Sequence, residues 1–557
     1  NWKSKAFALH GKLPPDSFEG SEAKTTCLAI GVLAVSMLLC RLSSTASSLV
    51  LVSSDQDKLP ITIQCEYQPE AKLCTTFKKC LEKIVAPVDN MSVSLGRWLG
   101  ALRKIIPDDH LWILVGHESS LQQCMEFSPH ILVLVNDEGT ELMLQSDLSP
   151  SLTSILHSCF GNILESIAGV VFGAMNNGAS KRTLASPPLL SSKDRKMFVE
   201  DFNDTSHQFE AKSCLLHELF EQRAMQVPLD HVALIEGDDE THRSTTTYSE
   251  LLELVKALAR KFMSLGVKCE DRVAVWLPRS RVMIAAVLAV LKAGGAYVPC
   301  DDGLPYARLN SIVEVSSARL LLTNMRQEAL IPTDFSLCTV VCMETLLRVD
   351  EVGKLHLAFG DTDLPEIISA KRPSTKSLAY IIFTSGSTGK PKGVAIQHGS
   401  IVHLVEWVNT TFSVSTNDIL LFVTSIGFDL SCYDIFGSLA AGSKIRIAPA
   451  NATADKLFKM LRSEGITFWD SAPPVLQQLQ DQLSESLAAG DCIADLRLVF
   501  MSGDWVPVQL VSVLQKATHA KVVALGGATE VTVWSNFFTA EKLDPQWRFM
   551  PYGRPIW

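Results

Sequence analysis

TSGSTGKPKG, residues 384–393, contains four hydroxyl side chains, three glycines and two lysines within ten residues. Glycines let backbone N–H groups close around an anion, hydroxyls add further donors, and lysine supplies compensating charge. The apolar run at residues 378–383 leads into this stretch and has the character of a buried strand. The pattern therefore predicts a strand that runs into a phosphate-binding loop.

Two other interpretations of this stretch explain it less well. A flexible linker would account for the serines and glycines, but not for the Lys-Pro-Lys-Gly ending or the preceding strand. A P-loop requires Ser or Thr directly after its Gly-Lys pair, whereas Pro391 follows Gly389 and Lys390 here. The loop is therefore not a Walker site.

Composition limits the class of protein. With 557 residues and 47% hydrophobic content, the chain is long enough for two or three compact units. The formal charge of -10 argues against nucleic acid as a partner, because phosphate backbones require a basic surface. Fourteen cysteines without a Cys-x-x-Cys pair are typical of a reduced, cytoplasmic protein without a zinc or disulfide framework. The apolar run at residues 27–40 is shorter than the roughly 20 residues that cross a bilayer, so we expect a buried helix and no membrane partner.

Two regions of different character are joined by a polar stretch at residues 176–204, which we interpret as a linker. Upstream, residues 1–175 include a strand-like run at 131–135 and helical apolar spacing at 152–167. Downstream, residues 205–557 alternate strand-like runs such as 272–276 with apolar helical runs such as 282–291. This alternation predicts an α/β fold with mainly parallel strands.

The downstream region carries several short motifs in a fixed order. They are LLHELFE (215–221), TYSEL (247–251), LKAGGAYVP (291–299), the glycine-rich loop, FDLS (428–431), GATE (527–530) and PYGRP (551–555). Together they resemble the large N-terminal subdomain of a non-ribosomal peptide synthetase adenylation domain, a member of the adenylate-forming superfamily. The resemblance implies layered αβ sheets with a small β-barrel-like part, and a ligase that activates a carboxylate with ATP, giving an acyl-adenylate and pyrophosphate.

The upstream region resembles, by its pattern of elements, the C-terminal lobe of a condensation domain. Its helix at 27–42, its strand-like run at 59–63 and its late strand and helix ending near Ile167 follow that order. The resemblance implies an α/β lobe like that of chloramphenicol acetyltransferase. The family's adjacent histidine pair is absent, so we expect this lobe to be truncated or degenerate and inactive in peptide-bond formation.

The resemblance also assigns an ATP site. It implies that the triphosphate is held by Thr384, Ser385, Gly386, Ser387, Thr388, Gly389 and Lys392, and that Gly527, Ala528, Thr529 and Glu530 line the adenine and the activated carboxylate. Glu530 would help to hold Mg²⁺, which prefers carboxylate and phosphate oxygens. Lys392, Thr529 and Glu530 are therefore the expected catalytic residues. A solvated surface lysine and a helix-capping Thr-Glu pair remain the alternatives.

A substrate site follows from the same resemblance. Asp429 lies in an apolar context and would pair with the α-amine of an amino acid, although a structural aspartate bonded to backbone N–H groups remains possible. The side-chain pocket would be formed by Leu430, Tyr433, Asp470, Phe500, Ser502, Leu525, Val533 and Trp534. Its bulky aromatic residues indicate a small substrate, either cysteine-like or, because of the second carboxylate at Asp470, a small cation-bearing acid.

The family completes its site with a C-terminal subdomain that carries a hinge, a ribose-binding aspartate and a catalytic lysine. The sequence reaches Trp557 before these motifs, so we expect it to be part of a longer synthetase, followed by a carrier domain with phosphopantetheine. The leading hypothesis is activation of a small amino acid for such a synthetase in secondary metabolism. The alternatives are a stand-alone acyl-CoA or aryl-CoA ligase and a non-catalytic docking module.

Overall fold

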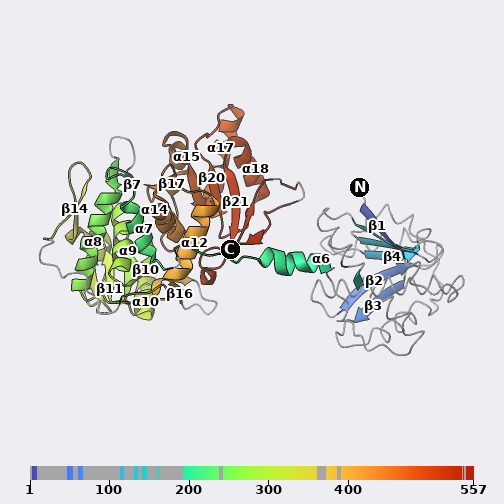
Figure 1. Cartoon of the computed structure of the whole chain (residues 1–557), viewed down its shortest axis with the longest axis horizontal. Coiled ribbons are helices and arrows are strands. Elements are labelled where there is room, and N and C mark those ends of the chain that lie inside the picture. Colours follow the sequence, from blue (N-terminus) through green and yellow to red (C-terminus); the bar gives the residue numbers. More distant parts are fainter. Residues whose placement is uncertain are drawn as a thin grey trace. The chain divides into compact units, whose positions relative to one another are not determined.

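The structure, a computed structural model, describes residues 192–557 apart from 212, 238–242, 361–371, 385–390, 542 and 545–546. Upstream of these it describes the backbone of six strands and residues 159, 162 and 163. The chain divides into two compact units, Asn1–Asn203 and Asp204–Trp557 (Figure 1). The division into domains predicted from the sequence, with its linker at 176–204, stays a prediction.

The first unit contains a six-stranded sheet. Its strands, in spatial order, are β1 (Lys3–Ala8), β6 (Glu141–Ser146), β5 (Ile131–Val135), β4 (Ile113–His117), β2 (Ser47–Ser53) and β3 (Ile61–Glu66). The central pairs β2–β4 and β4–β5 are parallel, and the outer pairs are antiparallel. The predicted strand at 131–135 is confirmed by β5. The predicted helix at 27–42 and most of the helical run at 152–167 lie outside the described residues.

The unit ends in a short helical segment within the region that we interpreted as a linker. This segment consists of α6 (Ser192–Arg195), the π-helical turn η2 (Lys196–Glu200) and the 3-10 turn η3 (Asp201–Asn203). None of its residues is buried. The likeness of the first unit to a condensation lobe stays a prediction.

The second unit contains two large sheets. One has the order β12 (Thr339–Cys342), β11 (Leu320–Thr323), β9 (Arg272–Trp276), β10 (Ala296–Cys300), β15 (Leu378–Thr384) and β16 (Lys392–Gln397). The other has the order β23 (Arg554–Pro555), β22 (Asn536–Thr539), β21 (Lys521–Gly526), β20 (Leu498–Met501), β19 (Phe468–Ser471), β17 (Ile419–Phe422), β18 (Lys444–Ile447), β7 (Val232–Glu236) and β8 (Ser244–Thr247). A hairpin of β13 (Leu347–Val349) and β14 (Leu355–Leu357) stands apart.

The central strands of both sheets are buried on both faces, which creates a layered arrangement. In β20, Leu498 and Phe500 belong to one apolar cluster, whereas the alternate residues Val499 and Met501 belong to another. Side chains alternate across a strand, so the two clusters lie on opposite faces of the nine-stranded sheet. The cluster that contains Phe500 also takes up Val273 of β9. One core therefore lies between the two sheets.

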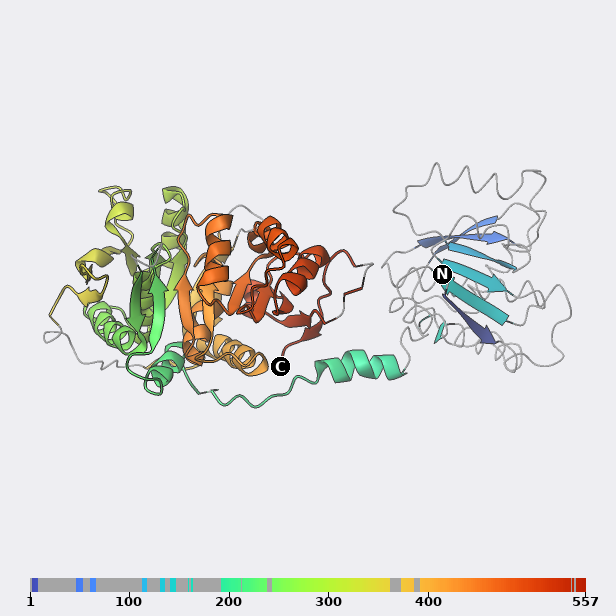
Figure 2. The same cartoon turned by 90° about the horizontal axis from the view of Figure 1, so that it is seen from above.

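Helices occupy three layers around these sheets (Figures 1 and 2). The central core contains α7 (Leu216–Ala224), α8 (Tyr248–Ser264), α9 (Arg281–Lys292), α12 (His398–Thr411), α13 (Leu430–Cys432), the π-helical turn η5 (Tyr433–Gly437) and α14 (Ser438–Ala441). The outer face of the nine-stranded sheet is covered by α15 (Ala454–Ser463), α16 (Pro473–Gln477), α17 (Gln480–Ala488) and α18 (Val508–Ala517). The other sheet carries α10 (Tyr306–Ser316), and the short α11 (Met325–Glu328) and η4 (Met343–Thr345) connect its strands.

Local sequence explains two of the central helices. Helix α8 begins with a capping box, in which the Thr247 side chain accepts from the N–H of Glu250 and the Glu250 carboxylate accepts from the N–H of Thr247. Helix α9 is apolar around its whole circumference and almost entirely buried, as expected for a helix between two sheets. The predicted runs at 272–276, 282–291 and 378–383 are confirmed as β9, α9 and β15.

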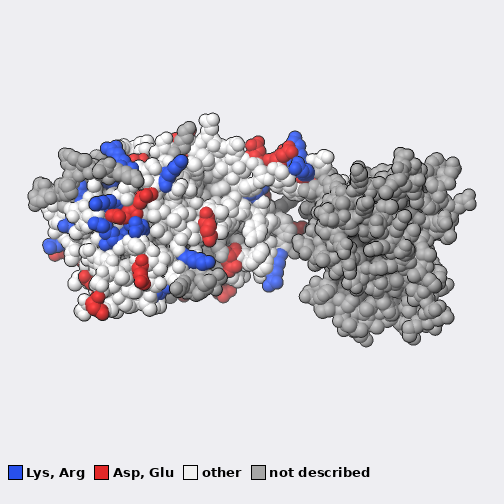
Figure 3. All heavy atoms as spheres, turned by 90° about the horizontal axis from the view of Figure 1, so that it is seen from below, with Lys and Arg blue, Asp and Glu red and all other residues white. Residues whose placement is uncertain are grey.

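The α/β fold class is thus confirmed for the second unit. The expected barrel-like part stays a prediction, and the nine-stranded sheet ends at one edge in the antiparallel strands β22 and β23. Figure 3 shows one face of this unit, on which basic and acidic side chains are intermixed. Within the described part of the chain, no helix combines the length and the apolar character that crossing a bilayer requires.

Candidate active site

The carboxyl ends of three adjacent parallel strands form the base of the site. In the register of the nine-stranded sheet, Asp470 of β19 pairs with Phe500 of β20, and Phe500 pairs with Val523 of β21. Ser502 follows β20, and residues 527–530 follow β21. In open α/β sheets, ligands bind at this end of the strands. The structure therefore brings residues from distant parts of the sequence to the place where a ligand is expected.

Three aromatic residues predicted for the side-chain pocket form one buried cluster. The ring centroids of Tyr433 and Trp534 are 5.6 Å apart, and those of Phe500 and Trp534 are 5.5 Å apart. The Trp534 indole N–H donates to the Ser502 hydroxyl at 2.9 Å, and the Tyr433 hydroxyl donates to the Asn409 side chain at 2.8 Å. These hydrogen bonds fix the rings, so the pocket wall is preorganised.

A tight turn after β21 positions the remaining wall. Thr532 and Val533 have φ angles of 65° and 69°, in the left-handed region that β-branched residues rarely occupy. The turn brings the Val533 carbonyl against Gly527, where an added Cβ would collide with it. Val533, Leu525 and Leu430 are all buried. Glycine at 527 is therefore required by the close backbone approach.

Asp429 lies directly before α13 and is half-buried. Burial raises the pKa of its carboxyl group, and hydrogen bonds from the Thr529 side chain and from backbone N–H groups act in the opposite direction. The neighbouring Glu530 carboxylate raises the pKa further. The FDLS and GATE motifs thus meet at one point, with two carboxylates and a hydroxyl side by side.

The glycine-rich loop connects two paired strands. Ser385, Gly386, Ser387, Thr388 and Gly389 lie outside the described residues. Thr384 ends β15, Lys392 begins β16, and these two residues face each other in the antiparallel ladder. Strand β16 also lies next to the turn η6 (Thr529–Val531). The exposed Lys392 and the exposed Glu530 therefore belong to neighbouring elements at the base of the loop.

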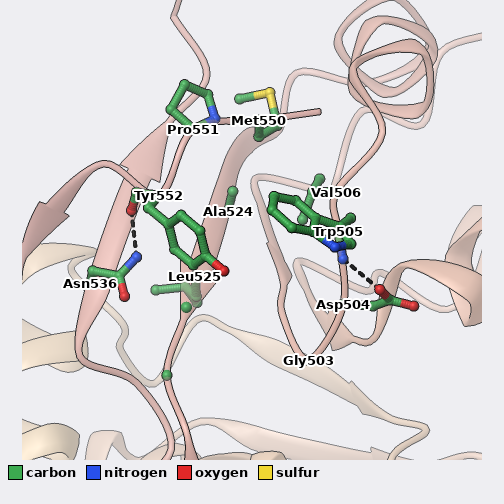
Figure 4. A pocket seen from close by; sticks show the side chains of 12 residues that line it. Gly503, Asp504, Trp505, Val506, Ala524, Leu525, Asn536, Met550, Pro551 and Tyr552 are labelled. Carbon is green, nitrogen blue, oxygen red and sulfur yellow. Dashed lines mark hydrogen bonds between the residues drawn. The ribbon is translucent and has the colours of Figure 1, made fainter. Parts of the chain in front are cut away.

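A pocket of about 320 Å³ opens beside this turn (Figure 4). Its lining includes Gly526 and Gly527, the loop 503–506 after β20, and residues 550–552. Trp505 and Tyr552 are exposed and flank the pocket, with ring centroids 5.9 Å apart. Our sequence analysis gave neither aromatic residue a role. The position of Trp505, just after the strand-like run at residues 498–501, is the sequence feature that could have indicated a role in ligand binding.

A second acidic residue, Asp434, lies beside Asp470 and was also missed by the sequence analysis. Both side chains are 0% exposed, and they lie within hydrogen-bonding range of each other. Asp434 belongs to the π-helical turn η5, a distortion that is common at functional sites. Burial is the main cause that raises the pKa of both carboxyl groups above their usual range.

The residues around Glu530 are compatible with a metal ion that is held mainly by a bound substrate and only partly by protein side chains. No cluster of three His, Cys, Asp or Glu side chains suited to a metal ion occurs among the residues that the structure describes. Mg²⁺ commonly binds through one or two carboxylates together with substrate phosphates and water. The exposed Glu530 carboxylate next to the strand of Lys392 fits such a site.

These features define a class: a layered α/β protein with a ligand site at the carboxyl ends of its parallel strands. The family model described as AMP-binding enzyme matches residues 220–557. The chain therefore belongs to the AMP-binding enzyme family.

Individual proteins of known sequence or structure are also similar to this chain. Bacitracin synthase 1 of Bacillus licheniformis is 32% identical over 369 residues, which are 66% of this chain and 6% of that protein. The N-terminal subdomain of NpsA from Klebsiella oxytoca, solved in complex with 3-hydroxybenzoyl-AMSN, has a TM-score of 0.52 and 25% identity, covering 63% of this chain and 81% of that one. The non-ribosomal peptide synthetase FmoA3 has a TM-score of 0.72 at 24% identity, covering 100% of this chain and 60% of that one, which shows a shared fold. The chain spans only a small part of the curated relative.

Proposed function

We propose that this chain activates the carboxylate of a small amino acid with ATP, as an acyl-adenylate, within a non-ribosomal peptide or hybrid synthetase. The observation that carries the proposal is the meeting of Asp429, Thr529 and Glu530 beside the strand that begins with Lys392. A half-buried carboxylate next to a phosphate-binding loop suits a substrate that has both an ammonium and a carboxylate group. The resemblance to bacitracin synthase supports the same assignment.

The roles of individual groups follow from their positions. Lys392 would stabilise the negative charge that grows on the phosphates as pyrophosphate leaves. The Thr529 hydroxyl, which donates to Asp429, would hold that carboxylate in position for the substrate amine. Glu530 would hold Mg²⁺, which supplies charge neutralisation on the phosphate oxygens. Asp429 would distinguish amino acids from fatty or aryl acids, which lack an amine.

The nucleotide base would occupy the pocket that Trp505 and Tyr552 flank. Both residues are exposed, and the backbone of Gly526 and Gly527 forms another wall. Purine bases stack on aromatic side chains with a favourable energy of roughly 1–3 kcal/mol for each base. The exposed aromatic residues at the rim of the pocket are consistent with this use.

The wider setting also belongs to the proposal. The activated amino acid would pass to the phosphopantetheine arm of a downstream carrier domain, and the reaction would take place in the cytoplasm. Within the side-chain pocket, the aromatic cluster around Trp534 favours a small substrate. Cysteine-like residues and small cation-bearing acids are the two candidate classes.

Substrate-dependent ATP–pyrophosphate exchange tests the proposal. The panel would contain cysteine, serine, small diamino acids, small sulfonium acids, and fatty and aryl acids. We expect exchange with one small amino acid class. Exchange only with fatty or aryl acids would instead identify a stand-alone acyl-CoA or aryl-CoA ligase. Absence of exchange with every acid, under conditions in which ATP binds, would identify a non-catalytic docking module.

A further inference from the structure

Asp434 and Asp470 form a buried carboxyl pair at the base of the proposed substrate pocket. Both are 0% exposed, and no N–H or hydroxyl group of the described residues donates to their carboxyl oxygens with good hydrogen-bond geometry. The Thr424 hydroxyl lies nearby and donates to the main-chain oxygen of Asp470 at 3.4 Å. Two carboxyl groups that lack a full set of donors cannot both carry a charge at such close range without a large energetic cost.

A proton between the two groups removes this conflict. A protonated carboxyl group donates one hydrogen bond and keeps its carbonyl oxygen as an acceptor. The proton is expected on Asp470, because the cation Arg279 lies near Asp434, whereas the carboxylate Asp429 lies near Asp470. Asp470 is therefore the donor, and Asp434 is the acceptor.

The surrounding charges agree with this arrangement. The guanidinium of Arg279 favours the charged form of Asp434, whereas Asp429 disfavours a charge on Asp470. Cys432 and Tyr433 are the other titratable groups close to the pair, and burial keeps both in their neutral forms. A single negative charge on Asp434 is thus balanced by Arg279, and Asp470 remains uncharged.

We propose that Asp470 is a neutral carboxylic acid in the substrate-free site, that Asp434 is the positioning residue that keeps it so, and that the substrate side chain is consequently small and uncharged. The inference rests on the proposed function, in which Asp470 borders the substrate side chain. Asp470 donates its proton to Asp434 and turns its carbonyl oxygen toward the pocket. This group has the hydrogen-bonding capacity of a carboxamide, which accepts from a hydroxyl or thiol. The second carboxylate is therefore not the partner of a cation.

Amide substitution provides a sharp test. Asp470→Asn replaces a neutral acid by a neutral amide of the same shape, so exchange with cysteine or serine should stay within about threefold of the unmodified chain. Asp470→Ala removes the hydrogen bond and should lower kcat/KM at least about tenfold. If Asp470→Asn loses as much activity as Asp470→Ala, or if only amino acids with a side-chain ammonium are activated, the inference is wrong.

The role of Asp434 is tested by a second substitution that should restore the properties lost in Asp434→Asn. In Asp434→Asn, the new amide N–H can donate to Asp470 and stabilise its ionised form, so the KM for the amino acid should rise about tenfold while the KM for ATP is unchanged. The alkaline decline in kcat/KM that loss of the shared proton would cause should move to lower pH. Adding Asp470→Asn should restore both properties. A double variant that is no better than Asp434→Asn would show that Asp434 has only a structural role.

A measurement without substrate separates this inference from the proposed function. NMR titration of the chain labelled with carbon-13 at its aspartate carboxyl groups should show one carboxyl group of the pair that retains its proton at neutral pH, and Asp470→Asn should remove this signal. Two ionised carboxylates at pH 7 would overturn the inference even if exchange is observed. If the retained proton is found but no acid is activated, the proposed function fails and the shared proton stands.

Discussion

At the scale of single residues, the site depends on charged and aromatic groups that have little structural function of their own. Lys392 is exposed at the first position of β16. Its replacement should therefore leave the fold unchanged and affect only ligands. The same reasoning applies to Trp505, which is 58% exposed.

Lys392→Ala should slow ATP–pyrophosphate exchange by roughly 10²-fold, because one preorganised charge at a developing anion contributes about 3 kcal/mol. Circular dichroism should be unchanged. Lys376→Ala, an exposed lysine in the loop before β15, is the matched control and should have the activity of the unmodified chain. Equal activity of both variants would remove the proposed role of Lys392.

Asp429→Ala should raise the KM for the amino acid by about 10²-fold or more, since an ammonium loses its charged partner. ATP affinity, measured by calorimetry, should change far less. Thr529→Val, which removes only the hydroxyl that bonds to Asp429, should show a smaller loss of the same kind. An equal loss of ATP and amino-acid affinity in Asp429→Ala would mean that Asp429 is structural.

Trp505→Ala should weaken ATP binding about tenfold, because the base loses one stacking face. Trp505→Phe keeps an aromatic face and should retain most of the affinity. Fluorescence of Trp505 should also change when ATP is added to the unmodified chain. An unchanged affinity in Trp505→Ala would place the base outside this pocket.

At the scale of elements, two buried histidines join α7 and α12. The backbone N–H of Leu216 donates to Nδ1 of His398 at 3.2 Å, and His217 lies opposite, with ring centroids 6.1 Å apart. Burial lowers the pKa of His398 to about 4 and that of His217 well below its usual range. Both rings are therefore neutral in the folded chain at pH 7.

These histidines should make the contact between α7 and α12, and so the stability of the fold, sensitive to acid. Below about pH 6.5 the unfolded chain takes up protons on both rings, while the folded chain does not do so on His398 until about pH 4. The free energy of unfolding should therefore fall as the pH falls through this window, by up to about 1.4 kcal/mol per pH unit for each histidine. Denaturation curves of the unmodified chain and of His398→Gln, compared between these limits, isolate the share of His398. Parallel pH profiles would contradict the assignment.

The elements show how far sequence reasoning reaches. Strands β5 and β9 match their predictions because short apolar runs rich in β-branched residues favour buried strands. Tyr433, Phe500 and Trp534 come together in one buried cluster, and their role as part of a substrate pocket stays a prediction. Asp434 could not be found in this way, because its burial depends on β19, which is distant in the sequence. The pairing of Trp505 with Tyr552 likewise depends on contacts between distant segments.

At the scale of the whole molecule, the second unit contains complete apolar cores of its own. The clusters between and outside its two large sheets consist of residues from 216 onward. A domain with its own core can fold independently. The second unit should therefore fold without the first.

A chain consisting of residues 204–557 should unfold cooperatively and bind ATP within about twofold of the affinity of the full chain. Thermal unfolding and calorimetry would measure both. As a control for correct assembly of the strand ends, Asp470→Asn should have the same effect in the shortened chain as in the full chain. An insoluble or non-cooperative product would show that the first unit is needed to stabilise the second.

The turn at Thr532 and Val533 sets two effects on stability against each other. A valine held in the left-handed region stores roughly 1–3 kcal/mol, which a glycine at the same position would release. Val533 is also buried, so Val533→Gly would lose apolar contacts and give the unfolded chain more freedom, at a comparable cost. Laboratory selection for heat resistance should therefore gain little at this position, and the rigid turn that carries Trp534 should persist.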